Sequence, residues 1–493
     1  MNKQIRRLAA GLLVCFLILF VQLNRLQVVQ RDSIASNTNN NRAVLRDFDK
    51  PRGAIVTADG VEIANSVAST DDKFKYQRVY PTKDLFANVS GYYTYAFGAT
   101  KLEKKYTEVL TGRTSEQQIR SLANILSNED NTGSVQLTMR ADLQQVAKDA
   151  LGEREGSVVV LDPRTGAVLA MYSYPSYDPN VVAVHNNTDA QNALEFLNNY
   201  PGKPTLANAY QERYMPGSTF KVVTTGIALE AGLIDFDSFW ANESEYLPPD
   251  TTNPIANYKG HVCGGDLREV FRRSCNTPFA RIAVELGPQA MVAGTQAWGI
   301  GEKIPFDIPG AVASNFGTVE ELQNNIPRLA IRGFGQDDDL MVPLQMAMIT
   351  STVANGGVMM QPYAVEATLD HNGGILDQTK PSPWKTPLSQ ANALKLTELM
   401  IGVVQNGTAK CCLQLANGVQ AAAKTGTAQL NATGEPQRSH AWITAFAPAE
   451  APRFAVAVIL KGTTADISEG TGGVLAGPIA KTVLDFAMTL PTS

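Results

Sequence analysis

The sequence contains Pro216-Gly217-Ser218-Thr219-Phe220-Lys221 directly before an apolar run, 222–227, which predicts a turn that enters a helix. Residues three apart share one helix face, so we expect Ser218 and Lys221 within hydrogen-bonding reach of each other. Serine becomes a strong nucleophile when a neighbour accepts its proton. Lysine can do so once burial at a helix start, near a second lysine, lowers its pKa. The pattern predicts a serine nucleophile with a lysine base.

Ser-x-x-Lys alone is a weak signal, because Ser218 taken by itself would more often be a helix cap than a nucleophile. A second copy, Ser382-Pro383-Trp384-Lys385, fits the same pattern. Pro387 follows it at once and no apolar helix continues it, so we expect this copy in a loop. The Ser218 copy therefore needs partner motifs.

Two further motifs follow in the chain. Ser274-Cys275-Asn276 comes after the amphipathic stretch 267–271, where a hydroxyl can relay a proton and an amide can bind a peptide. Lys424-Thr425-Gly426-Thr427 lies on a predicted strand, where a lysine and two hydroxyls can bind a carboxylate and Gly426 allows close approach of substrate backbone. Each motif alone could be an ordinary helix cap or a strand with a surface lysine. Their order within one domain favours a single site.

This set of three motifs resembles that of penicillin-binding proteins and serine β-lactamases. Across nearly the whole chain, the sequence is similar to the class B penicillin-binding proteins, and most like the short actinobacterial septal form. The similarity includes further segments: Arg52-Gly53 with Asp59-Gly60, Pro175-Ser176-Tyr177-Asp178-Pro179-Asn180, Pro343-Leu344-Gln345-Met346-Ala347 and His440-Ala441-Trp442. Cys275 and Met215 depart from the usual family pattern without removing a group that has an assigned role.

The resemblance implies a D,D-transpeptidase that cross-links peptidoglycan stem peptides, uses lipid-linked precursor, is inhibited by β-lactams and needs no cofactor or metal. Ser218 would be acylated by the penultimate D-Ala carbonyl, with Lys221 as base. The backbone N–H groups of Ser218 and Thr427 would form the oxyanion hole. Ser274 and Lys424 would pass the proton to the departing D-Ala, and Asn276 would hold the acyl chain. Carboxylate recognition would fall to Lys424, Thr425 and Thr427.

We expect an α+β protein in three parts: a cytoplasmic tail and membrane anchor (1–30), a small α+β pedestal or dimerisation-type domain (31–154), and a transpeptidase domain (155–493) whose antiparallel sheet is flanked by helices. The pedestal is expected to contain a hairpin at Asp59-Gly60 and a helix over 141–151. In the last part, strands over 157–161, 167–171, 441–446 and 454–460 should share the sheet, before a closing helix around 479–486.

The N-terminus carries a targeting segment, in which Lys3, Arg6 and Arg7 precede the uncharged stretch 8–24. A secretory signal peptide would look similar, but the nearest small-x-small triplet, 33–35, lies well beyond the apolar run, so an uncleaved anchor is favoured. The positive charges place the N-terminus in the cytoplasm. We therefore expect a single-pass protein of the bacterial cytoplasmic membrane with its catalytic domain outside.

Composition narrows the partners and the cysteine chemistry. Hydrophobic residues make up 44% of the chain, which excludes wholesale disorder, and a net charge of −5 gives no cation excess for nucleic acid. An exported domain permits disulfides. We expect a bond between Cys263 and Cys275, which flank one short helix, and none between Cys411 and Cys412, where it would distort the backbone. No metal-ligand spacing is visible.

Other functions of the same fold remain open: a β-lactamase, a D,D-carboxypeptidase, a β-lactam sensor or a non-catalytic division scaffold. Rapid hydrolysis of an acyl-enzyme needs a carboxylate base. We expect the candidates to be solvated surface groups: Glu230, Glu243, Glu245, Glu269 and Asp337–Asp339. A long-lived acyl-enzyme follows from this. No glycosyltransferase domain is recognisable, so we also expect a membrane glycan polymerase and division proteins as partners.

Overall fold

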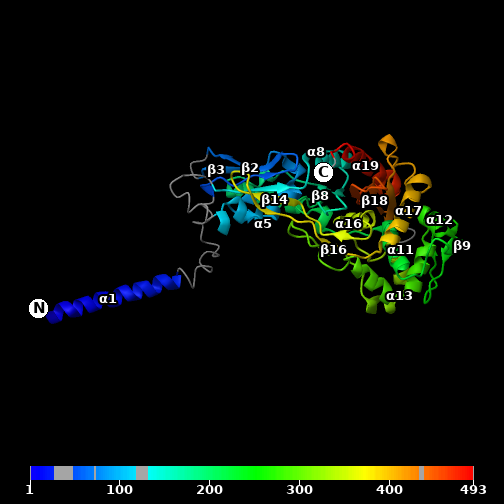
Figure 1. The fold of residues 1–493 in the computed structure, drawn as a ribbon, viewed down its shortest axis with the longest axis horizontal. Coiled ribbons are helices and arrows are strands. Elements are labelled where there is room, and N and C mark those ends of the chain that lie inside the picture. The colour runs from blue at the N-terminus through cyan, green and yellow to red at the C-terminus, as the bar shows by residue number, and fades with distance from the viewer. Residues whose placement is uncertain (1, 27–47, 71–73, 118–130, 432–437, 492–493) are drawn as a thin grey trace.

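The computed structural model describes residues 2–26, 48–70, 74–117, 131–431 and 438–491. Its first helix, α1 (Asn2–Asn24), exposes its large apolar side chains, with Leu8 and Phe16 at 68% and 70% exposure (Figure 1). Within the described residues, the segment Lys3–Asn24 is the one helix long and apolar enough to cross a membrane. It is a candidate membrane span.

The N-terminal part is built on a six-stranded sheet in the order β15-β14-β6-β1-β2-β3. The bounds are β1 (Ile55–Val56), β2 (Glu62–Ala68), β3 (Tyr76–Val79), β6 (Ser134–Leu137), β14 (Val365–Leu369) and β15 (Ile375–Gln378). The hairpin predicted at Asp59-Gly60 is confirmed: it joins β1 to β2, and Gly60 takes the left-handed conformation with φ 82°. Strands β14 and β15 return from much later in the chain to complete this sheet.

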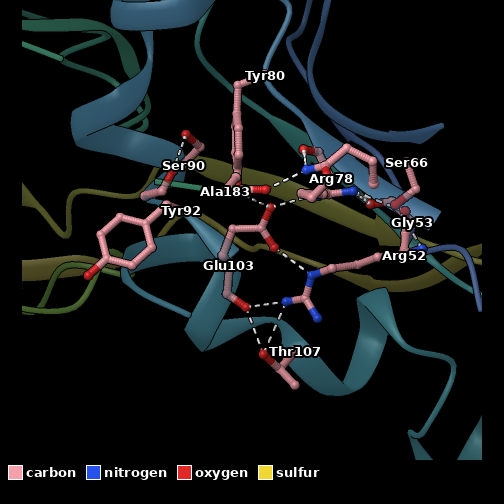
Figure 2. A network of polar contacts seen from close by, with 12 residues as sticks. Arg52, Gly53, Ser66, Arg78, Tyr80, Ser90, Tyr92, Glu103, Thr107 and Ala183 are labelled. Atoms are coloured by element: carbon pink, nitrogen blue, oxygen red, sulfur yellow. Dashed lines mark hydrogen bonds and ion pairs between the residues drawn. The ribbon is translucent and has the colours of Figure 1, made fainter. Parts of the chain in front are cut away.

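A buried charged cluster holds the N-terminal part together (Figure 2). Glu103 on α5 (Lys101–Lys105) accepts from Arg52 Nε at 2.5 Å and from Arg78 Nε at 2.7 Å. Arg78 also donates to the carbonyl of Arg52 at 3.0 Å, so the cluster ties the chain before β1 to β3 and α5. Its three charged side chains are almost completely buried.

A five-stranded antiparallel sheet, in the order β17-β18-β19-β7-β8, forms the centre of the larger part. Its strands are β7 (Gly156–Leu161), β8 (Val168–Tyr174), β17 (Ala422–Gln429), β18 (Ser439–Ala447) and β19 (Phe454–Leu460), which confirms the sheet predicted from both ends of this region. The predicted helices are α8 (Ala141–Leu151) and α19 (Gly472–Ala487), and they pack together over the sheet. Helix α16 (Pro343–Ala354) packs against β7, β18 and β19, below the sheet in Figure 1.

The helical region beside β17 completes this part and carries two of the three motifs. Its main elements are η4 (Gly217–Phe220), α11 (Lys221–Glu230), β9 (Phe239–Glu243), β10 (Glu245–Tyr246), β11 (Ile255–Ala256), β12 (Cys263–Asp266), α12 (Leu267–Arg272), α13 (Thr277–Ala297) and α17 (Gln390–Asn406). The prediction that the second Ser-x-x-Lys copy lies in a loop is wrong. Residues Pro383–Lys385 form β16, paired with β13 (Met359–Met360), and Lys385 donates to Glu302 at 2.6 Å.

Candidate active site

The first and third motifs lie directly against each other. Gly217, in the left-handed conformation with φ 54°, leaves room where a Cβ would lie 2.7 Å from the carbonyl oxygen of Thr427. A Cβ on Gly426 would lie 2.5 Å from the carbonyl oxygen of Pro216. Because both glycines lack this atom, the turn η4 can rest on strand β17 and bring Ser218 to its edge.

The second motif joins the other two through a pair of lysine amines. Lys221 Nζ donates to the carbonyl of Ser274 at 2.8 Å and to Asn276 Oδ1 at 2.9 Å, and lies 3.4 Å from Ser274 Oγ. Lys424 Nζ donates to the same Ser274 Oγ at 2.7 Å and to the carbonyl of Thr425 at 3.1 Å. The hydroxyl of Ser274 therefore lies between two amines.

Both amines are fully buried, and neither forms an ion pair with a carboxylate in the described part of the chain. Burial, and then the nearby Lys424, lower the pKa of Lys221 well below the ordinary lysine value. Burial lowers the pKa of Lys424 to about 7. Both lysines can therefore exist as neutral amines near physiological pH, as proton transfer requires.

Ser218 is half-buried and lies three residues before Lys221, on the turn that leads into α11. The hydrogen bonds of the Lys221 amine go to Ser274 and Asn276, and none joins it to Ser218 Oγ among the residues that the structure describes. The expected direct hydrogen bond is thus not formed in this state, because the carbonyl groups of the second motif attract the amine.

The threonines of the third motif are held by residues that sequence reasoning missed. Thr425 Oγ1 shares a hydrogen bond of 2.6 Å with Thr408 Oγ1, and Gln336 Nε2 donates to the Thr427 carbonyl at 3.3 Å. Both supporting residues lie outside helices and strands: Thr408 is 17 residues from its partner in the sequence and Gln336 is 91 residues from its own. No local pattern marked them, since their role depends on tertiary packing alone.

The structure joins Cys263 to Cys275 by a disulfide, which links β12 to the second motif. It also joins Cys411 to Cys412, so the expectation that these two remain unbonded is wrong. Both vicinal cysteines lie in the turn between α17 and β17, where the chain is free of helix and strand geometry and can adapt to the bond. Within the described ranges, no group of three or more His, Cys, Asp and Glu could hold a metal ion.

The acidic residues differ in part from expectation. Glu243 pairs with Arg281 at 2.8 Å and Glu230 accepts from the backbone N–H of Ser389 at 2.7 Å, so neither is a simple solvated carboxylate. Asp339 is completely buried, and this burial raises its pKa well above the ordinary value. The surface assignment of Asp339 was wrong because its neighbours Asp337 and Asp338, which do form ion pairs with Arg328, suggested an exposed acidic run.

Comparison with known proteins places these features in a family. Residues 156–485 match the penicillin binding protein transpeptidase domain, and residues 52–135 match the penicillin binding protein A dimerisation domain. The peptidoglycan D,D-transpeptidase PbpA of Mycobacterium tuberculosis is 36% identical over 498 residues, covering 99% of each chain. The peptidoglycan D,D-transpeptidase MrdA of Acinetobacter baumannii is 28% identical, over 83% of this chain and 66% of its own.

Solved structures agree with this placement. The ceftriaxone acyl-enzyme of M. tuberculosis penicillin-binding protein A superimposes with a TM-score of 0.83 at 35% identity, over 90% of this chain and 100% of that one. Its penicillin G acyl-enzyme gives a TM-score of 0.82 at 34% identity, over 89% and 100%. With the three motifs gathered at one edge of β17, the chain belongs to the penicillin-binding protein transpeptidase family, in its class B form.

Proposed function

We propose that this protein is a peptidoglycan D,D-transpeptidase that uses Ser218 as its nucleophile. The observation that carries the proposal is the convergence of two buried lysine amines, neither paired with a carboxylate in the described residues, on Ser274, beside the half-buried Ser218. The relatives named peptidoglycan D,D-transpeptidase and the β-lactam acyl-enzymes of M. tuberculosis penicillin-binding protein A support the same activity.

In the acylation step, neutral Lys221 takes the proton from Ser218 Oγ as this oxygen attacks the penultimate D-Ala carbonyl. The backbone N–H groups of Ser218 and Thr427 receive the oxyanion of the tetrahedral intermediate. When the peptide bond breaks, the hydroxyl of Ser274 gives its proton to the leaving D-Ala nitrogen. Charged Lys424, which donates to this hydroxyl, replaces that proton. The amine of a second stem peptide then attacks the ester, loses a proton to the same groups and restores Ser218.

Substrate recognition is assigned to the remaining motif residues. Charged Lys424, with the hydroxyls of Thr425 and Thr427, binds the terminal carboxylate of the donor peptide. Asn276 donates to the acyl chain's carbonyl, and Gly426 lets the peptide lie alongside β17 as an added strand.

The location and partners follow from the N-terminal segment. The three cations in the first turns of α1, before its apolar stretch, favour a cytoplasmic N-terminus, so α1 would anchor the protein with its catalytic domain on the extracytoplasmic side. We assign glycan polymerisation to a separate membrane polymerase, because both matched domains are accounted for by dimerisation and transpeptidation. A role in division, with division proteins as partners, is part of this proposal.

The test has two stages. Labelled penicillin should acylate the wild-type protein and Ser382→Ala equally, whereas Ser218→Ala should remain unlabelled. Lipid-linked, pentapeptide-bearing substrate supplied with a polymerase should then yield D,D cross-links that are lost in Ser218→Ala. Labelling that persists in Ser218→Ala would overturn the assignment of the nucleophile.

The lifetime of the penicillin adduct separates a transpeptidase from a β-lactamase. Rapid hydrolysis of the adduct needs a general base beside the acyl ester, and none of the acidic residues discussed above belongs to a motif that supplies one. The labelled enzyme should therefore keep its label for many minutes after excess drug is removed. Release within seconds, with repeated drug hydrolysis, would favour a β-lactamase instead. Release of free D-Ala from pentapeptide without cross-links would favour a carboxypeptidase.

A further inference from the structure

The second motif occupies a strained position between two helices. Ser274 adopts the left-handed backbone conformation, with φ 62°, although it is not a glycine. Such a conformation persists only where the surroundings hold it. The residues around Ser274 must therefore supply the restraint that keeps its hydroxyl between the two lysine amines.

Asn276 occupies the N-cap position directly before α13, but its side chain makes no capping hydrogen bond. Asparagine at a helix start normally accepts hydrogen bonds from the first backbone N–H groups. Here the side chain makes no capping bond, because Oδ1 accepts from Lys221 Nζ at 2.9 Å and Nδ2 donates to the Ala256 carbonyl at 3.2 Å. The amide of Asn276 is thus committed to the site, and the start of α13 needs another acceptor.

Asn257, nineteen residues earlier in the chain, supplies that acceptor. Its Oδ1 accepts from the backbone N–H of Asn276 at 2.6 Å and from that of Thr277 at 3.1 Å. Its Nδ2 donates to the Glu243 carbonyl at 2.9 Å and to Thr277 Oγ1 at 3.3 Å. The side chain is buried, so all its polar atoms are engaged without water.

We propose that Asn257 is a positioning residue for the transpeptidase site: it caps α13 from outside the helix and thereby frees the amide of Asn276 for Lys221 and the substrate. The inference rests on the proposed function, since it concerns the geometry of the same reaction. The Cys263–Cys275 disulfide restrains the same motif from the same chain segment and is a second, covalent tether.

The test compares substitutions at Asn257 in the full chain, using a fluorescent penicillin at several concentrations to separate the maximal acylation rate from the apparent affinity. Asn257→Ala should lower the maximal rate about 10- to 100-fold, since small displacements of reacting groups have effects of this size. Asn257→Asp keeps the acceptor for both N–H groups and should stay within about fivefold of wild type. If Asn257→Ala does not fold, Asn257→Ser, with a shorter acceptor, takes its place and should fall between the two.

A matched control is Asn186, which caps α9 (Asn187–Asn199) by accepting from the Thr188 N–H at 2.9 Å. Asn186→Ala also removes an asparagine cap, and it should lower the melting temperature without changing the maximal acylation rate. The tether is tested by Cys263→Ala with Cys275→Ala, which should lower the same rate, and combination with Asn257→Ala should lower it further.

The outcomes are distinguishable. A wild-type protein that penicillin does not acylate would refute the proposed function itself. If wild type is acylated and folded Asn257→Ala reacts at the same maximal rate, only the positioning role is overturned. An Asn257→Asp variant as slow as Asn257→Ala would also overturn the capping argument, because the acceptor would not be what matters.

Discussion

Two regions of this molecule bury cationic side chains, with opposite consequences. In the N-terminal part, Arg52 and Arg78 enclose the carboxylate of Glu103, with Tyr80 donating to the same group at 3.1 Å (Figure 2). Burial alone would raise the pKa of Glu103, but Arg78 and Arg52 outweigh it and hold this pKa below its ordinary value. Glu103 is therefore a carboxylate near neutral pH, paired with both guanidinium groups, and we call Arg52, Arg78 and Glu103 the arginine cluster.

The two motif lysines, Lys221 and Lys424, are buried as deeply as the arginine cluster, yet their hydrogen-bond partners are neutral. Lys221 and Lys424 contact hydroxyls, carbonyls and an amide. A buried charge without a counter-ion costs the folded state free energy. A lysine avoids this cost by losing its proton, whereas a guanidinium group cannot be deprotonated in a protein. The comparison shows that burial without a carboxylate partner lowers the pKa of a lysine, and we propose that this makes the two motif lysines reactive.

The largest expected effect is that of Lys221→Met. Removing the proposed base should lower the penicillin acylation rate by about 10³-fold, within the range of general-base catalysis. The folded state should lose little stability, because a buried amine without a counter-ion disappears. Rates are measured by fluorescent penicillin and stability by urea denaturation. Lys385→Met, in the second Ser-x-x-Lys copy, is the matched control and should react like wild type; equal rates for both variants would contradict the assignment.

Glu103→Gln should show the reverse of Lys221→Met: a large loss of stability with no loss of acylation rate. It leaves two buried guanidinium groups without a carboxylate, which should lower the free energy of unfolding by about 3–5 kcal/mol. The acylation rate of the folded fraction should be unchanged. Glu398→Gln breaks an exposed ion pair with Arg268 and should cost less than about 1 kcal/mol in the same urea experiment. Similar losses in both variants would remove the distinction between paired and exposed charges.

Another buried cation, Lys101, tests whether a missing carboxylate is sufficient for reactivity. Lys101 donates to Tyr210 Oη at 3.0 Å and to Gln211 Oε1 at 2.8 Å, and burial lowers its pKa to about 7. Tyr210 also donates to the carbonyl of Asn88, and Gln211 Oε1 also accepts from the N–H of Ala207, so Lys101→Met leaves both partners hydrogen-bonded.

Lys101→Met should therefore raise the free energy of unfolding by about 2 kcal/mol near pH 7, since each unit of lowered pKa costs the folded state roughly 1.4 kcal/mol and hydrogen bonds offset part of it. The cost of the wild-type lysine is complete below its folded pKa of about 7 and declines as the pH rises toward 10.5. The advantage of the variant should shrink accordingly between pH 7 and 10. A pH-independent difference would contradict this. Acylation should not change, because Lys101 hydrogen-bonds to Tyr210 and Gln211, which belong to none of the three motifs.

The contrast between the two regions also marks what the sequence could predict. The three motifs, the hairpin at Asp59-Gly60 and the strands of the five-stranded sheet were predictable, because each is a local pattern. The arginine cluster was not: Arg52-Gly53 was noticed only as a family motif, and nothing in the sequence connected it to Glu103. Their partnership arises because the chain before β1, strand β3 and helix α5 meet only in the folded structure.

The wrong predictions and the features that no prediction covered have the same origin. Strands β14 and β15 join a sheet formed more than two hundred residues earlier, so their pairing depends on tertiary structure. Asp339 was assigned to the surface from its acidic neighbours, although it is buried. Asn257 carries no motif, because its role is to accept hydrogen bonds from backbone groups, which any sequence supplies. The vicinal disulfide was rejected on general backbone geometry, whereas the turn at Cys411 and Cys412 accommodates it.

The smallest expected effect, and the sharpest test of the comparison, is a pH-dependent split between affinity and rate. Lys424, with its pKa lowered to about 7 by burial, should lose its charge as the pH rises from 6.5 to 8.5. Its attraction for the penicillin carboxylate then weakens, so the apparent affinity should fall about tenfold as the charged fraction declines. The maximal acylation rate should persist over this range, because the bound carboxylate holds Lys424 in its charged form in the saturated complex, where it still supplies the leaving-group proton. Burial, and then Lys424, lower the pKa of the proposed base Lys221.

Stopped-flow acylation over a range of drug concentrations measures both quantities at each pH. Glu103 does not change its charge in this window, because its pKa lies below its ordinary value of 4.5, so the arginine cluster cannot produce the effect. A maximal rate that rises through pH 7 while the affinity stays constant would reverse the two roles. Lys424 would then be the base and Lys221 the permanent cation, and the counter-ion argument would apply to only one member of the pair.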